Sequence, residues 1–112
     1  FILARKAGVD PMKVREALLG GFAASRVLEL HGERVLTGNF IPGFRAAPYA
    51  KDLRIAAATI AELDVPAQVS AIVHQLVEAL VAAGRGEDDC SALATVLLDR
   101  AGLSAAPATK TK

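Results

Sequence analysis

The sequence is poor in cysteine and in aromatic residues, and it carries almost no net charge. Its single cysteine, Cys90, excludes an internal disulfide and is typical of a reducing compartment. Thirteen basic and twelve acidic residues leave a formal charge of +1, so the composition does not indicate binding to nucleic acids or anionic membranes. No apolar run approaches the roughly 20 residues that span a bilayer. We therefore expect a soluble, cytoplasmic protein with no nucleic-acid or membrane partner.

The apolar content is high, but small residues supply much of it. Hydrophobic residues make up 53% of the 112 residues, many of them alanine, and only 4% of the residues are aromatic. Such a mixture favours helices that approach closely over a sheet of bulky β-branched side chains. The length suits one hydrophobic core. We therefore predict an all-α fold, built as a single helical domain.

Local signals place the helices of the first third of the chain. Asp10 is suited to cap a helix whose first residue is Pro11 and which the Gly20-Gly21 pair ends. Ser25 is suited to cap the next helix, over residues 25–36. We expect Gly32 to break that second helix into two pieces.

A long apolar stripe dominates the second half of the sequence. It lies within residues 65–84, and its spacing predicts the central core helix. After a polar loop, Asp88 or Asp89 is suited to cap a last helix, and residues 104–112 have the composition of a disordered tail. The stripe consists of Val69, Ile72, Val73, Leu76, Val77, Leu80 and Val81.

Several common kinds of site have no counterpart in the sequence. No Gly-x-Gly-x-x-Gly segment follows a predicted strand, and no phosphate-binding P-loop is present. His31 and His74 lie far apart and lack the spacing of metal ligands, so no metal site is predicted. Ser25 and Ser91 are typical helix-start residues without a histidine placed by sequence to activate them.

The segment PGFRAAPYAKDL, residues 42–53, is unlike the rest of the chain. Its two prolines constrain the backbone, so that Phe44 and Tyr49 are presented from a segment with little conformational freedom. Because Pro48 disfavours the helical conformation at the residue before it, we expect the following helix to begin only at about Lys51 and to end at about Leu63.

The charges Lys51 and Asp52 would then stand at the start of this helix. Asp52 is favoured there by the helix dipole, whereas Lys51 is not. A lysine at this end is explained either by an anionic or polar ligand that it faces or by extension into water. The residues alone leave both explanations open.

Four stretches together resemble a known family. They are GVDPMKVREALLGGFAASRVLELHGERVL (residues 8–36), NFIPGFR (39–45), KDL (51–53) and DDCSAL (88–93). Their order resembles that in the C-terminal helical domain of the β-hydroxyacid dehydrogenases, which has the 6-phosphogluconate dehydrogenase C-terminal-like fold. The resemblance covers residues 1–103, which we expect to form the domain that closes the cleft and mediates dimerisation, and leaves 104–112 as the tail.

The resemblance implies that the chain is a fragment of a two-domain enzyme. Residues 1–8, FILARKAG, begin without methionine and are similar to the end of the helix that follows an N-terminal Rossmann domain. That missing domain would bind most of the NADH or NADPH cofactor, and the parent protein would be a homo-oligomer. The catalytic lysine of the family lies in the missing part, so no catalytic residue is expected in this chain.

The resemblance also implies an activity and site residues. The expected reaction is reduction of tartronate semialdehyde (2-hydroxy-3-oxopropionate) to glycerate. The alternatives are dehydrogenation of 3-hydroxyisobutyrate, reduction of another short semialdehyde, or a stand-alone helical protein-interaction module. By resemblance, Lys51 approaches the nicotinamide end of the cofactor, while Phe44 and Asp52 shape the substrate cleft. Relatives usually have histidine in place of Cys90, which puts any role of that histidine in doubt here.

Overall fold

A computed structural model describes residues 1–104, and this part of the chain is entirely helical apart from its connecting loops. No strand occurs in it, which confirms the predicted all-α fold; two residues, Arg45 and Asp89, form an isolated antiparallel bridge. None of its helices is long and apolar enough to cross a membrane. Apart from Ser104, the predicted disordered tail lies outside the described residues.

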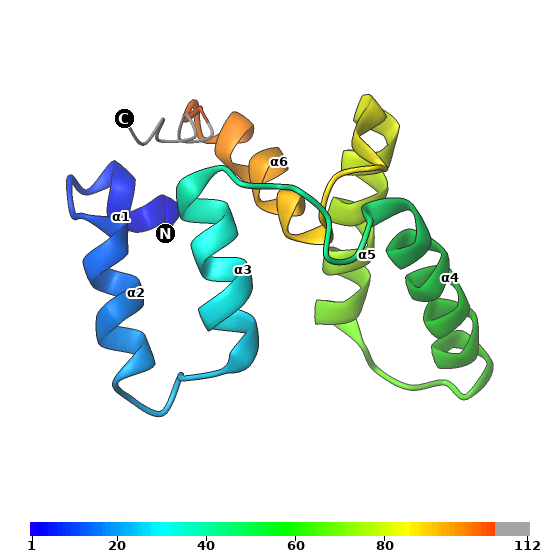
Figure 1. Cartoon of the computed structure of the whole chain (residues 1–112). Helices are drawn as coiled ribbons and strands as arrows, with labels where there is room; N and C mark the ends of the chain where they lie inside the picture. Colours follow the sequence, from blue (N-terminus) through cyan, green and yellow to red (C-terminus); the bar gives the residue numbers. More distant parts are fainter. Residues whose placement is uncertain (105–112) are drawn as a thin grey trace. The chain divides into compact units, whose positions relative to one another are not determined.

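The described part of the chain divides into two compact units, of which the first contains residues 1–40 and 97–104. Within it α1 packs on α2, and α2 lies beside α3 (Figure 1). The caps are those predicted: the Asp10 carboxylate accepts the Met12 N–H at 2.9 Å, and the Ser25 hydroxyl accepts the Leu28 N–H at 3.0 Å. The helices are α1 (Ile2–Lys6), α2 (Pro11–Leu19) and α3 (Arg26–Thr37).

The predicted break at Gly32 is wrong, because α3 runs through this residue without interruption. Gly32 is buried, and a Cβ atom at this position would lie 3.3 Å from the side chain of Arg15 on α2. Arg15 donates hydrogen bonds to the carbonyl oxygens of Leu28 and Glu29, the latter at 2.6 Å. The missing side chain therefore makes room for Arg15, which offsets the roughly 1 kcal/mol that glycine costs inside a helix.

The second unit, residues 41–96, is built around α4 and α5, which lie side by side (Figure 1). Its elements are α4 (Ala46–Glu62), α5 (Gln68–Leu80), the wide turn η1 (Val81–Arg85), the short helix η2 (Cys90–Ala92) and the beginning of α6 (Leu93–Arg100). The buried apolar residues are Ala46, Ala50, Leu76, Val77, Leu80 and Ala92. The core thus combines alanines of α4 with larger side chains of α5.

Only part of the predicted apolar stripe on α5 is buried. Val69 and Ile72, near the beginning of the helix, are 76% and 58% exposed, whereas Leu76, Val77 and Leu80 are buried. The prediction of a core helix is therefore correct for the second half of α5 and wrong for the first half. An apolar stripe shows which face of a helix packs against another element, but not how much of the helix that element covers.

Helix α4 begins at Ala46, so the predicted start at about Lys51 is wrong. Pro48 does not delay the helix, because it is the third helical residue, where a backbone N–H would have no partner within the helix. Lys51 and Asp52 consequently lie in the second turn of α4. The effect of the helix dipole is confined to the first turn, so the electrostatic argument from the helix end does not apply to them.

Backbone hydrogen bonds from the loop before η2 explain the early start of α4. The Ala46 N–H donates to the Asp88 carbonyl oxygen and the Ala47 N–H to the Gly86 carbonyl oxygen, each at 2.9 Å. Since Pro48 has no N–H, the donors of the first three helical positions are accounted for. The helix therefore needs no side-chain cap, and Arg45 at the capping position provides none.

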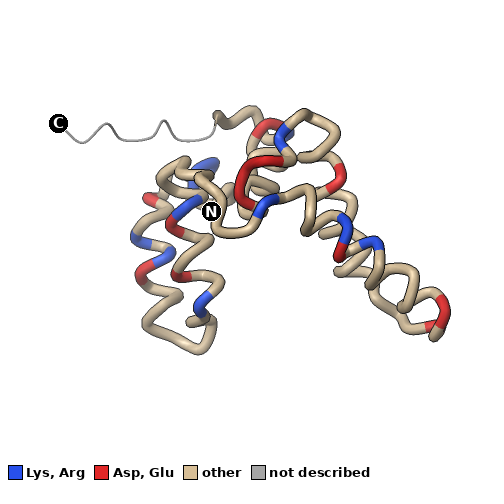
Figure 2. Tube along the Cα trace, turned by 45° about the vertical axis from the view of Figure 1, so that its right-hand side comes forward, with Lys and Arg blue, Asp and Glu red and all other residues tan. Residues whose placement is uncertain are grey.

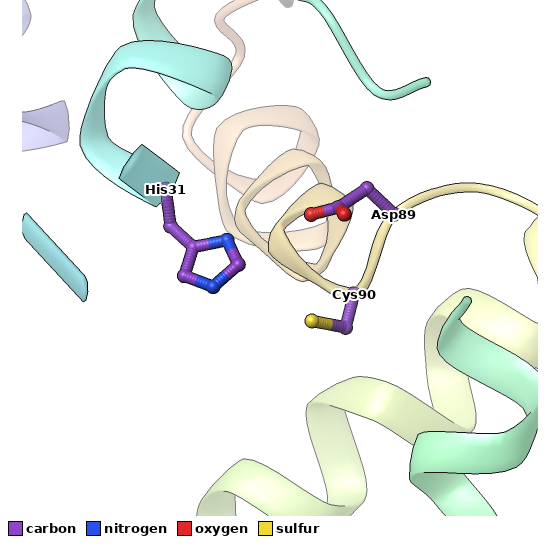
Figure 3. Close-up of side chains that lie close together, drawn as sticks. All are labelled: His31, Asp89 and Cys90. Carbon is purple, nitrogen blue, oxygen red and sulfur yellow. The ribbon is translucent and has the colours of Figure 1, made fainter. Parts of the chain in front are cut away.

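The carboxylate of Asp89, drawn in Figure 3 beside Cys90 in the segment before α6, adds further hydrogen bonds between the same two loops. Asp89 is fully buried, and its Oδ2 accepts the N–H groups of Gly43 at 2.9 Å and Phe44 at 3.3 Å. Its Oδ1 accepts the N–H of Ser91 at 3.0 Å and the Ser91 hydroxyl at 2.6 Å. The Cys90 N–H donates to the Phe44 carbonyl oxygen at 2.8 Å. The segment before α4 is thus fixed to the segment before α6.

Two opposing effects set the pKa of Asp89. Burial by itself raises it, but the hydrogen bonds from Ser91, Gly43 and Phe44 outweigh burial and lower the pKa from 3.8 to about 2. The carboxylate is therefore ionised at neutral pH, and it is stabilised by hydrogen-bond donors that water would otherwise provide.

The contact between Gly86 and α4 leads to a first prediction. A Cβ atom at Gly86 would lie 3.1 Å from the Cβ of Ala47, which cannot turn away because it is attached directly to the helix backbone. Gly86→Ala is expected to lower the free energy of unfolding by about 1 to 3 kcal/mol, a typical cost of overpacking. Thermal and urea unfolding followed by circular dichroism would measure this loss.

The matched control is Gly20→Ala. Both glycines have negative φ, −62° at Gly86 and −81° at Gly20, so neither substitution strains the backbone. At Gly20 the new Cβ would meet its nearest neighbour at an ordinary 3.5 Å. If both variants changed the stability equally, the close contact at Gly86 would not be the cause.

The low pKa of Asp89 gives a second prediction. A carboxyl group whose pKa is lower in the folded state stabilises the fold above its unfolded pKa, and this contribution disappears as the pH falls through the folded value. For a pKa that folding lowers from 3.8 to about 2, the contribution is about 2 kcal/mol and is lost between about pH 4 and pH 2. Urea unfolding across this pH range should show a steeper loss of stability in the wild type than in Asp89→Asn. Equal slopes would contradict the assignment.

Candidate functional site

Phe44 is held by its backbone and presents its ring to the outside. Its N–H is bound by the Asp89 carboxylate and its carbonyl oxygen by the Cys90 N–H, while its side chain remains 45% exposed. The ring meets Tyr49 edge to face, with centroids 6.0 Å apart and planes at 71°. This geometry is favourable for two aromatic rings. The segment around the start of α4 thus brings the rings of Phe44 and Tyr49 together.

The loop that receives the start of α4 is itself held by charged groups. Arg85 donates to the Asp88 carboxylate at 2.7 Å and to the hydroxyl of the buried Thr95 at 2.6 Å. A more exposed ion pair joins Arg45 to Glu87 at 2.8 Å, and its contribution to stability is small because both groups are largely in water. The loop before η2 is therefore held to Thr95 on α6 through Arg85, and to Arg45 through Glu87.

The side chains of Lys51 and Asp52 are exposed to solvent. Neither side chain forms a hydrogen bond or ion pair with any other residue among 1–104. Nearby Arg54, in contrast, pairs with Glu78 on α5 at 3.4 Å. Figure 2 shows basic and acidic residues mixed along the chain in each unit. Lys51 and Asp52 are therefore available to a ligand or to another domain.

The three residues predicted for the site, Phe44, Lys51 and Asp52, do not all lie on the same side of α4. Each residue advances about 100° around an α-helix, so Asp52 lies on the same side of α4 as Tyr49, three residues before it. Lys51 lies about 200° around the axis from Tyr49, on another side of the helix. The Phe44 ring, which contacts Tyr49, is thus grouped with Asp52 rather than with Lys51.

A hollow with a volume of about 220 Å³ opens between α4 and α5, beyond the point where their core ends. Alanines form much of its wall, and this volume is below the roughly 300 to 1,000 Å³ of typical small-molecule pockets. Its lining is mostly apolar, so it is a surface that the core of α4 and α5 leaves uncovered. The lining residues are Leu53, Ala56, Ala57, Ile60, Ala61, Ala67, Ser70, Ala71 and His74.

Sequence reasoning missed the second function of Asp89. The expectation that Asp88 or Asp89 caps the last helical segment is met by Asp89, whose carboxylate accepts the Ser91 N–H at the start of η2. The same carboxylate also binds the N–H of Phe44, 45 residues away in the sequence, and no local pattern announces such a contact. The backbone N–H of Cys90 contributes to this connection through its hydrogen bond to the Phe44 carbonyl oxygen.

Comparison with known proteins places these residues in a family. A family model described as "NAD-binding of NADP-dependent 3-hydroxyisobutyrate dehydrogenase" matches residues 1–97. The chain is 43% identical over 97 residues to the 2-hydroxy-3-oxopropionate reductase of Escherichia coli strain K12, an alignment that covers 87% of the chain and 33% of the relative. It is 35% identical over 97 residues to a probable 3-hydroxyisobutyrate dehydrogenase-like 1, mitochondrial, of Arabidopsis thaliana, over 87% of the chain and 29% of that protein.

The matched region contains both units up to the first half of α6, and it includes Phe44, Lys51, Asp52 and Asp89. The chain spans about a third of the length of the curated relatives that it matches. Because the family model covers most of the chain, the protein belongs to the family of the NAD-binding domain of NADP-dependent 3-hydroxyisobutyrate dehydrogenase.

Proposed function

We propose that this chain is the C-terminal helical domain of an NAD(P)H-dependent oxidoreductase that reduces 2-hydroxy-3-oxopropionate (tartronate semialdehyde) to glycerate. The observation that carries the proposal is the 43% identity, over nearly the whole chain, to a protein named 2-hydroxy-3-oxopropionate reductase. In this proposal residues 1–103 form the domain that closes the cleft, and an N-terminal Rossmann domain binds most of the cofactor. The cytoplasm is the proposed location.

Lys51 is the residue proposed to face the cofactor. Its ammonium group is exposed and is not paired with another residue among 1–104, which suits a contact with a polar or anionic group. The described residues contain no strand, so they cannot form the strand–turn–helix unit that binds a dinucleotide. The chain therefore fits a supporting role toward NADH or NADPH, which would supply the hydride when bound.

Phe44 and Asp52 are proposed to face the substrate. The fixed backbone of Phe44 would hold its ring against the small substrate and keep water from that side of the cleft. The exposed Asp52 carboxylate is able to accept a hydrogen bond, and it would help to order the general-acid lysine that the family resemblance assigns to the missing part. The separation of Lys51 from Asp52 around α4 is consistent with one facing the cofactor and the other the substrate.

A second candidate is the dehydrogenation of 3-hydroxyisobutyrate, which the description of the family and the 35% identity to the Arabidopsis protein favour. A candidate of a different class is a stand-alone interaction module, favoured by exposed apolar residues such as Leu63, Val69 and Ile72. The sequence encoded upstream separates these classes, because a Gly-x-Gly-x-x-Gly motif after a strand is expected only for the enzyme.

The same exposed apolar residues are the basis for proposing contacts with other parts of the parent protein. A helix that leaves apolar side chains such as Val69 and Ile72 in water is stabilised when another element covers them. We propose that the Rossmann domain and a second subunit cover these surfaces, and therefore that the parent protein is a homo-oligomer.

Replacing Lys51 tests the proposed site. In the full-length protein, Lys51→Ala is expected to lower kcat/KM for semialdehyde reduction at least tenfold, because about 1.4 kcal/mol of transition-state stabilisation would be lost. The consumption of NADPH and NADH with 2-hydroxy-3-oxopropionate and with methylmalonate semialdehyde would be compared. Lys13→Ala, which removes an exposed lysine from α2, is the matched control. A rate unchanged by Lys51→Ala would identify Lys51 as an ordinary solvated residue while the reaction class stands.

The division of labour between the domains gives a further prediction. Residues 1–112 alone are expected to be inactive and to bind NADPH too weakly to detect at micromolar concentrations, because the dinucleotide-binding unit is absent from the described residues. A fluorescence titration with NADPH would measure the affinity, with the full-length protein as the positive control. Micromolar binding by the isolated chain would refute this division.

A further inference from the structure

We infer that Asp89 is a positioning residue for the substrate side of the cleft, and that it acts through the backbone of Phe44. The inference rests on the proposed function, since it assigns Phe44 to the substrate. It goes beyond that function by naming a buried residue that would control the site without touching either the substrate or the cofactor.

The contacts of Asp89 show why its effect would be directed at Phe44. One oxygen of the carboxylate is occupied by Ser91, at the start of η2, through a backbone N–H and a hydroxyl. The other oxygen binds the N–H groups of Gly43 and Phe44. A single rigid group thus connects the two segments, and the Phe44 ring is attached to one of the residues that it holds.

Phe44 depends on this connection more than its neighbours in α4 do. Its backbone N–H and carbonyl oxygen are both bound by the segment containing Asp89 and Cys90, while its ring is 45% exposed and meets Tyr49 edge to face. Helix α4, in contrast, has its own hydrogen bonds to Asp88 and Gly86. Loss of the Asp89 contacts should therefore displace Phe44 before it displaces Lys51.

A purely structural role, as a cap of η2, would leave the Gly43 and Phe44 contacts unexplained. Capping a helix requires one oxygen and a nearby N–H, as in Asp10, whose carboxylate accepts the N–H of Met12 two residues away. Asp89 is fully buried, and its second oxygen accepts the N–H of Phe44, which lies 45 positions away in the sequence. Maintaining an ionised group in such a place is costly unless all its acceptors are used.

The test uses Asp89→Asn in the full-length protein. The amide keeps the size of the side chain, but its NH₂ group would face N–H donors on one of the two sides, so that side of the connection is lost. We expect kcat/KM for the semialdehyde to fall about tenfold or more, mainly through KM for the semialdehyde rather than for the cofactor. Asp10→Asn, which makes the same change at the cap of α2, is the matched control and should stay within about twofold.

A double-mutant cycle with Phe44→Ala separates positioning from general damage. If Asp89 acts through Phe44, adding Asp89→Asn to Phe44→Ala should change kcat/KM by less than about twofold, because the group being positioned is already absent. If the two effects multiply, Asp89 acts independently of Phe44 and the inference is overturned. It is likewise overturned if Asp89→Asn alone leaves kcat/KM unchanged in the folded protein.

Amide hydrogen exchange provides a measurement that needs neither activity nor a stable variant. In the wild type the N–H groups of Gly43 and Phe44 should exchange far more slowly than that of Phe22, whose side chain is fully exposed in the loop between α2 and α3. Exchange as fast as at Phe22 would overturn the inference. If the wild type reduces no semialdehyde, the proposed function fails on its own, and slow exchange would still show that the N–H groups of Gly43 and Phe44 are held in the folded protein.

Discussion

The buried carboxylate of Asp89 is the interaction on which the second unit of this protein depends. It connects the segment before α4 to the segment before α6 through hydrogen bonds to Gly43, Phe44 and Ser91. These donors keep the pKa of Asp89 low in spite of its burial, so the connection is made by a charged group. The backbone hydrogen bonds at the start of α4 lie beside this carboxylate. Where α4 begins determines where the proposed site residues Lys51 and Asp52 lie along the helix.

The small side chains of α4 have a second effect on the arrangement of the site. Ala46 and Ala50 allow the start of the helix to approach its core closely, and the closeness of Ala47 to Gly86 shows how little space remains. Farther along, alanines no longer fill the distance between α4 and α5, and a hollow opens. One end of α4 is thus tightly fixed, whereas the other offers an apolar surface that another domain or subunit would cover.

Local signals predicted much of the fold, and contacts distant in sequence account for what was missed. The caps at Asp10 and Ser25 are formed by residues two or three positions apart, so they are readable from the sequence. Gly32 and the start of α4 were mispredicted because Arg15 and the carbonyl groups of residues 86 and 88 outweigh local preference. For the candidate site, motif resemblance pointed to Lys51, Asp52 and Phe44, and their roles stay predictions. The contacts of Asp89 with Gly43 and Phe44 could be found only from the structure, because they join residues far apart in the sequence.

Pro48 illustrates how a residue can stabilise this arrangement through its effect on the unfolded chain. In the first turn of α4 its missing N–H removes no helical hydrogen bond, and its fixed φ matches the helical value. In the unfolded chain, the same ring restricts Pro48 and Ala47 to fewer conformations. Less conformational entropy is therefore lost when the segment around Phe44 becomes ordered, a gain of about 0.4 to 1 kcal/mol at a compatible position. Part of the stability of this segment thus comes from the restricted conformations of the unfolded chain.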